Sequence, residues 1–163
     1  MTKDELKVIL DNHRLWLKGI NEVGVRADFR GSDLRGANLE RAHLGEAYLS
    51  GAHLETSNLR GAYLRGADLR GANLSGANLK GANLRNANLE NAYLEDADFR
   101  DASLSFANLK DANLEDADLK NVDLGSADLS GAYLRNADLY GANLSGAYLG
   151  DACFSGANFR ETK

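Results

Sequence analysis

The sequence predicts an all-β solenoid, a square and parallel β-helix of about seven coils that follows an N-terminal amphipathic α-helix. The first observation is a period of five: a bulky apolar residue recurs at every fifth position from Phe29 to Phe159, which makes 27 units without an insertion. The second is the composition of the unit, because its centre is Leu in 23 units and Ala stands two residues earlier in 24. Proline is absent, and Leu and Ala together make 51 of the 163 residues, a bias typical of a repeated unit.

A period of five fits neither an α-helix nor a straight strand. On an α-helix, five residues advance about 500°, so the leucines would spread around every face. In a straight strand, the odd spacing would make every second leucine side chain point toward the solvent. Ala and Leu can all point inward if each unit is a short extended piece followed by a bend of roughly 90°. Four bends then close a coil of about 20 residues, and coils stacked about 4.8 Å apart build a tower roughly 30 Å tall.

The repeated unit resembles the motif A(D/N)LXX of the pentapeptide-repeat family, as in the runs Ala72-Asn73-Leu74-Ser75-Gly76 and Ala117-Asp118-Leu119-Lys120-Asn121. The resemblance covers residues 27–161, which we expect to form one repeat domain with residues 162–163 as a C-terminal tail. It implies a right-handed quadrilateral β-helix. It also implies one candidate function, since the best-understood members of this family are dimers that mimic DNA and bind gyrase.

Before the repeats, residues 1–26 predict an amphipathic helix and a linker. Thr2 and Glu5 have the spacing of a capping box, and Gly19 is placed as a C-terminal stop, so we expect a helix over about residues 3–18. Its apolar stripe consists of Leu6, Ile9, Leu10, His13, Trp16 and Leu17. Because the first coil of a solenoid exposes its core and its strand edge, this helix is expected to cap that end. The alternative is a helix that binds a partner.

The far end of the solenoid has only four residues, Arg160 to Lys163, after the last repeat centre, too few to cover a coil. Phe154 and Phe159 fall on adjacent sides of that last turn. One hypothesis is a homodimer formed head to head through this C-terminal end, which would bury an open edge. The alternative is that the two rings themselves plug the core.

Residues twenty apart share one side of the square, so the sequence also predicts which side chains stack. The densest charge cluster repeats the segment Glu-Asp-Ala-Asp one coil later. The candidate interaction patch consists of Glu95, Asp96, Asp98, Glu115, Asp116 and Asp118. This acidic corner could accept a basic surface of a partner or hold calcium weakly. The favoured interpretation is a solvated corner that is partly paired with Arg100 and Lys120, because exposed charge clusters usually serve solubility.

A second column carries Tyr93, Tyr133 and Cys153, on the same side as His53. Aromatic residues are enriched at protein interfaces, so this column could form a contact patch. Outward tyrosines scattered along a surface are also ordinary, and Asn73 and Asn113 interrupt the column.

Charge and motif content exclude several classes of function. The 19 basic and 24 acidic residues give a net charge of −5, so direct nucleic-acid binding is not expected. No apolar run is long enough to span a membrane, no signal peptide is apparent, and the chain is expected to be cytoplasmic. The single Cys153 excludes an intramolecular disulfide, and zinc-ligand spacing, a nucleophile elbow and a phosphate loop are absent. No cofactor, metal or catalytic site is therefore expected.

These observations predict a non-catalytic scaffold that binds another protein through its outward positions. The alternative is an acidic DNA mimic that binds and modulates DNA gyrase. An enzyme is not expected, because a solenoid without an inserted loop offers no pocket that excludes water.

Overall fold

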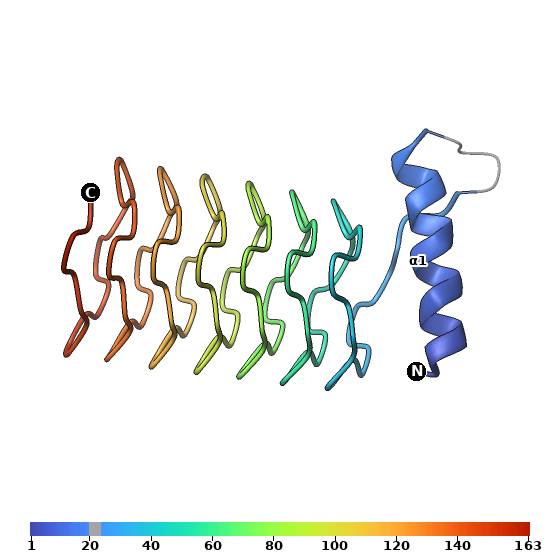
Figure 1. Cartoon of the computed structure of the whole chain (residues 1–163), viewed down its shortest axis with the longest axis horizontal. Helices are drawn as coiled ribbons and strands as arrows, with labels where there is room; N and C mark the ends of the chain where they lie inside the picture. Colours follow the sequence, from blue (N-terminus) through green and yellow to red (C-terminus); the bar gives the residue numbers. More distant parts are fainter. Residues whose placement is uncertain (20–23) are drawn as a thin grey trace.

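The computed structural model describes residues 1–19 and 24–163, so residues 20–23 of the predicted linker lie outside the described residues. It contains the helix α1, Lys3–Leu17, and a stack of coils formed by the repeats. Figure 1 shows the coils stacked along the long axis, with α1 lying across the N-terminal end of the stack. The repeats form isolated parallel bridges between residues twenty apart, beginning with the pair of Asp28 and Tyr48 and ending with Asp138 and Asn158.

Each unit ends in the same hydrogen-bonded turn. The carbonyl of every repeat centre accepts a hydrogen bond from the backbone N–H three residues later, for example from Ala77 to Leu74 at 2.9 Å. The second residue after every centre has a positive φ, and 15 of these 27 positions are not glycine. A single positive φ at this place is the pattern of a type II β-turn. The bends therefore use Asp and Asn as well as glycine, and even Thr56 and Phe106, with φ of 55° and 60°.

The Ala and Leu positions form one continuous core along the axis of the stack. Leu79 and Ala77 in a middle coil are both fully buried, as is Phe99 at the centre of its unit. Backbone groups pair between coils: the N–H of Leu79 donates to the carbonyl of Asp98 in the next coil at 2.8 Å. Since hydrogen bonds and the core both depend on neighbouring coils, no single unit is stable alone.

The Asn or Asp before a repeat centre provides a hydrogen-bond acceptor for the backbone N–H that follows that centre. In all 18 units that carry Asn or Asp there, the side-chain oxygen accepts from the backbone N–H two residues later, at 2.9–3.3 Å. That N–H has no partner in the ladder between coils. The preference of the motif for Asn and Asp is thus explained by an Asx turn, which satisfies a donor that the stack leaves free.

At the N-terminal end, one buried histidine forms hydrogen bonds between α1 and the start of the stack. His13 is fully buried, its Nδ1 accepts from the N–H of Ala27 at 3.1 Å, and its Nε2 lies 3.0 Å from the carbonyl oxygen of Gly45. The first contact fixes the tautomer, so Nε2 carries the proton and donates to Gly45. Burial lowers the pKa of His13, opposed by the hydrogen bond to Gly45, so the ring is neutral near pH 7.

The apolar stripe of α1 is only partly covered. Leu6, Ile9 and Leu10 are partly buried against the core. Leu17, which the stripe placed among the buried residues, is instead 41% exposed. It is the last residue of α1 and lies beside Gly45, which has no side chain to cover it.

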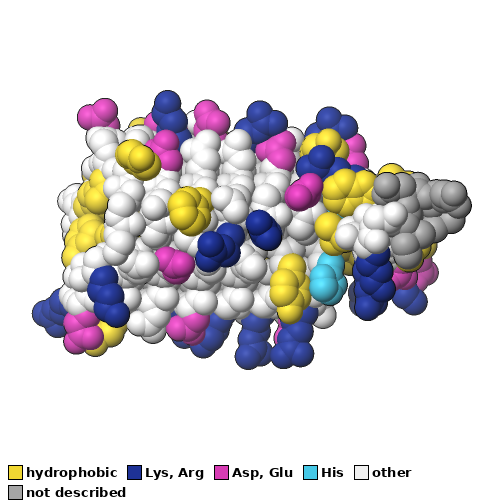
Figure 2. All heavy atoms as spheres, turned by 90° about the horizontal axis from the view of Figure 1, so that it is seen from above, with side chains coloured by type: hydrophobic (Ala, Val, Ile, Leu, Met, Phe, Trp, Pro, Cys, Tyr) yellow, Lys and Arg dark blue, Asp and Glu magenta, His cyan; other side chains and the backbone are white. Residues whose placement is uncertain are grey.

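The C-terminal end of the stack exposes its core. Figure 2 shows hydrophobic side chains gathered at the end opposite α1. Phe154 and Phe159 pack edge to face with ring centroids 5.1 Å apart, but Phe159 and Leu149 each remain 38% exposed. The two rings therefore do not cover this end completely.

Candidate functional site

Tyr93 and Tyr133 project from one side of the stack, two coils apart, with Asn113 between them. Parallel bridges join Tyr93 to Asn113 and Asn113 to Tyr133, so the three residues form one column. Each lies directly before a buried Leu, and alternation along the extended piece turns its side chain outward. The two tyrosines are 53% and 56% exposed, which leaves most of each ring free to contact a partner.

A shallow hollow of about 300 Å³ lies between the two tyrosines. It is lined by Asn91, Ala92, Tyr93, Asp111, Asn113, Glu115 and Tyr133. Two carboxylates belong to this lining and no basic residue does. The hollow therefore combines aromatic walls with a negative rim.

Glu95 and Glu115 are held in place beside this hollow. Glu95 accepts hydrogen bonds from the Ser75 hydroxyl at 2.9 Å and from the Asn113 amide at 2.6 Å. Glu115 forms an ion pair with Arg135 of the next coil, and this contact raises the pKa of the guanidinium. Both carboxylates have fixed positions, which lowers the entropic cost of using them to bind a ligand.

The turn residues Asp96, Asp111 and Asp116 are exposed at the corners of the same side. All three have a positive φ, of 55° to 57°. Asp116 accepts one hydrogen bond from the Asn136 amide at 3.1 Å. Together with Glu95 and Glu115 they place five carboxylates around the tyrosine column, against one guanidinium, that of Arg135. We call these five acidic side chains, together with Tyr93 and Tyr133, the tyrosine–acidic face.

The six residues of the predicted acidic corner do not form one cluster. Asp98 and Asp118 stack in the neighbouring column, where basic side chains neutralise them. Arg100 contacts Asp98 through two hydrogen bonds of 2.8 and 2.6 Å and lowers the pKa of that carboxyl. Lys120 lies 3.3 Å from Asp118 and 3.0 Å from Asp138. Only the four residues at positions 95, 96, 115 and 116 belong to the tyrosine–acidic face.

The remaining candidates lie near the two ends of the tyrosine column. Cys153 is exposed at the end of the tyrosine column, and the Nδ1 of His53 lies 3.7 Å from Glu55 near its start. Over residues 1–19 and 24–163, no group of three or more His, Cys, Asp or Glu side chains could hold a metal ion. Among those same residues, no helix is long and apolar enough to cross a membrane.

Sequence reasoning treated the tyrosine column and the acidic corner as separate features. The structure joins them because Tyr93 and Glu95 belong to one unit and extend from the same side of the stack. The roles of Asn113 and Asp111 were missed. The sequence could have placed Asn113 between the two tyrosines, because it lies twenty residues from each of them and residues twenty apart stack.

Comparisons with known proteins identify relatives of the repeat region. The sequence profile of pentapeptide repeats matches residues 25–61, 47–86, 77–116, 97–136 and 123–160, so the matches together extend over most of the chain. A pentapeptide repeat protein from the thylakoid lumen of Arabidopsis thaliana is similar at 37% identity and a TM-score of 0.56. The match covers 58% of this chain and 66% of that protein, so this chain spans less than two thirds of its length.

Two further solved structures are similar at lower TM-scores. HetL, a pentapeptide repeat protein involved in heterocyst differentiation regulation in the cyanobacterium Nostoc sp. strain PCC 7120, is 27% identical over 85% of this chain and 87% of HetL, with a TM-score of 0.35. QnrB1, a plasmid-mediated fluoroquinolone resistance protein, is 21% identical over 85% of this chain and 77% of that protein, with a TM-score of 0.42. No curated protein sequence matches this chain.

Proposed function

Since the chain belongs to the pentapeptide-repeat family, whose members are generally structural rather than enzymatic, we propose that it is a non-catalytic scaffold that binds a protein through its tyrosine–acidic face. The observation that supports this proposal is the pair of half-exposed rings, Tyr93 and Tyr133, on either side of a hollow with a negative rim. Tyrosine is enriched where protein interfaces carry most of their binding energy.

The chemistry of this face selects a basic segment of the partner. An Arg or Lys side chain that enters the hollow would lie beside two aromatic rings, whose faces attract cations. Asp111 would supply carboxylate oxygens within the same hollow, and Glu115 would offer the oxygen that Arg135 does not contact. Arg can use both contacts, because its planar guanidinium stacks on rings and forms paired hydrogen bonds with carboxylates. Binding through exposed charges should weaken as salt concentration rises.

The test is calorimetric titration with a capped peptide of alternating Gly and Arg, at low and high salt. Replacement of both Tyr93 and Tyr133 by Ser should weaken binding at least about tenfold, equivalent to 1.4 kcal/mol. Tyr148→Ser is the matched control, because Tyr148 is 66% exposed on another side of the stack. Equal losses in the control and the double variant would argue against a specific face.

The DNA-mimic alternative stays a prediction and depends on the whole acidic corner, four of whose six residues also belong to the tyrosine–acidic face. It would use the acidic corner as a continuous negative stripe, but Arg100 and Lys120 neutralise Asp98 and Asp118. Gyrase supercoiling should therefore be unaffected by this protein over a wide titration, with or without a fluoroquinolone. Inhibition or drug protection that disappears when positions 95, 96, 115 and 116 are all changed to Lys would favour the DNA mimic instead.

The proposed homodimer through the C-terminal end is a separate matter of assembly. It would cover Phe159 and Leu149, which are both partly exposed there. Light scattering across a concentration series should show dimer, and Phe159→Lys should abolish it. Monomer at all concentrations would refute this mode of assembly.

A further inference from the structure

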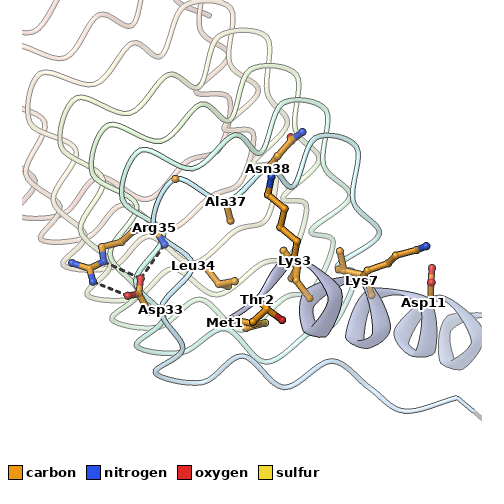
Figure 3. Close-up of a pocket in the computed structure, with 13 residues that line it drawn as sticks. Met1, Thr2, Lys3, Lys7, Asp11, Asp33, Leu34, Arg35, Ala37 and Asn38 are labelled. Carbon is orange, nitrogen blue, oxygen red and sulfur yellow. Dashed lines mark hydrogen bonds and ion pairs between the residues drawn. The ribbon is translucent and has the colours of Figure 1, made fainter.

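A groove separates the first half of α1 from the first coil of the stack. Its volume is about 640 Å³, within the range of ligand sites. It is lined by Met1, Thr2, Lys3, Leu6, Lys7, Leu10 and Asp11 of the N-terminal segment and by Asp33–Asn38 of the first coil. In Figure 3, Leu34 and Ala37 point toward the helix, while the paired side chains of Asp33 and Arg35 lie on the outer side.

The groove exposes an unpaired strand edge. In the second coil, the N–H of His53 donates to the carbonyl of Ser32, and the carbonyls of His53 and Glu55 accept from Leu34 and Gly36. The equivalent groups one coil earlier are the N–H and carbonyl of Asp33 and the carbonyl of Arg35. Within the described residues, these three groups have no backbone partner.

One side chain of α1 satisfies part of the edge of the first coil outside the groove. His13 bonds to Ala27 and Gly45, so that part of the edge is satisfied by a side chain. The segment of Asp33 to Asn38 has no such contact with α1 among the described residues, and it faces the groove instead. Other backbone groups of the first coil, such as the N–H and carbonyl of Asp28, also have no backbone partner among the described residues, but those of Asp33 to Asn38 are the ones that line the groove.

We propose that this groove binds an extended peptide segment of another protein, which adds to the edge at Asp33 as a parallel strand in the place of a preceding coil. This binding mode is β-strand addition, in which main-chain hydrogen bonds give affinity and side-chain pockets give specificity. The geometry of the stack defines the sequence of the bound segment as a small residue, then any residue, then Leu. The side chains of the small residue and of Leu would face Leu34, Ala37 and the helix. The inference concerns a different surface from the tyrosine–acidic face and does not depend on it.

The charged side chains that line the groove favour a peptide with acidic residues. Lys3 and Lys7 lie one helical turn apart, line the groove, and have no ion pair among the described residues. Asp33 is already neutralised by Arg35, which leaves Asp11 as the single uncompensated carboxylate of the lining. Two cations against one anion favour acidic residues on either side of the Ala-x-Leu core. An aliphatic ligand would leave the backbone groups of Asp33 unpaired, so a peptide fits the groove better than a lipid.

The test uses the full chain labelled with ¹⁵N and the capped peptide Glu-Ala-Asn-Leu-Glu-Gly. The amide of Asp33 should shift on titration and exchange its hydrogen more slowly, because its N–H gains the carbonyl of the peptide's Ala. Methylation of the peptide's Leu nitrogen removes the donor to the Asp33 carbonyl and should weaken binding about tenfold, or 1.4 kcal/mol. A peptide with Lys in place of both Glu should also bind more weakly.

Two variants of the protein locate the site. Lys3→Glu combined with Lys7→Glu should weaken binding of the acidic peptide about tenfold, whereas Lys18→Glu outside the groove should leave it unchanged. Ala37→Trp should block the groove, and the double lysine variant keeps the test valid if Ala37→Trp fails to fold.

Three outcomes would overturn the proposal. One is the absence of any shift at Asp33 up to the solubility limit of the peptide. Another is equal binding of the N-methylated peptide, or a shift at Asp33 with dodecanoate and none with peptide, which would indicate an apolar ligand. The third is a shift at Asp33 that depends on protein concentration alone, which would identify a second copy of this chain as the occupant.

Discussion

Thr56 offers a direct test of the turn geometry. Its φ is 55°, its side chain is exposed, and its N–H donates to the carbonyl of Ser75 at 3.0 Å. A β-branched residue in this left-handed region costs about 1–2 kcal/mol. Asn tolerates the region and keeps the backbone hydrogen bond, so Thr56→Asn should stabilise the protein by about 1 kcal/mol. No core contact changes, because the side chain points into solvent.

The expected shift is small but measurable. For a protein of this size, 1 kcal/mol corresponds to a rise in melting temperature of roughly 2–4 °C. Far-UV circular dichroism would record the melt. Gly76 occupies the same turn position one coil later, with a φ of 65°, and a Cβ there would lie 3.6 Å from Thr56 Cγ2. Gly76→Thr should therefore lower the melting temperature by a similar amount.

A matched control separates backbone strain from a general effect of Asn. Ser50 lies one position before a left-handed residue and does not have a positive φ. Ser50→Asn should leave the melting temperature unchanged. An unchanged or lower melting temperature for Thr56→Asn, together with a harmless Gly76→Thr, would refute the assignment of strain to this turn position.

Three further predictions concern the core and the end of the stack. Leu79→Asp buries a carboxylate without a partner and Ala77→Leu overpacks a fully buried position, so each should unfold the middle coils, and a melting curve that matches the parent would contradict the inward assignment. Ser57 is fully buried with no partner for its hydroxyl among the described residues, so Ser57→Ala should raise stability by about 1 kcal/mol in urea denaturation, and a loss would show that the hydroxyl is bonded. Because burial lowers the pKa of His13, the docking of α1 should be complete above the ordinary histidine pKa of about 6.5 and should weaken as pH falls below it. Trp16 fluorescence should report this change, His13→Gln should remove most of it, and His53→Gln should leave it intact.

The regular spacing of the chain made the β-helix predictable, since five-residue units with Ala and Leu in fixed places allow few other folds. The family assignment is confirmed by the profile that matches from residue 25 to residue 160. Other features depend on atoms that a pattern does not place. The left-handed turns at Asp96 and Asp116 could not be inferred from the pattern, because residues other than glycine rarely adopt a positive φ.

The candidate site was only half predictable, for a physical reason. The register correctly groups Tyr93 with Tyr133, because residues twenty apart stack. It does not tell which carboxylates are neutralised, since that depends on how far a long side chain such as Arg100 or Arg135 reaches. The spacing of the helix places His13 in an apolar stripe. Its two hydrogen bonds to the first coil follow from the approach of α1, which no local pattern encodes.

The most direct test of the central claim is a map of amide shifts in the ¹⁵N-labelled protein during titration with the Gly-Arg peptide. We expect shifts in the tyrosine–acidic face, concentrated at Tyr93, Asn113 and Tyr133, and their loss at high salt. Shifts centred on the column of Asp98 and Asp118, or spread evenly over all four sides, would contradict it.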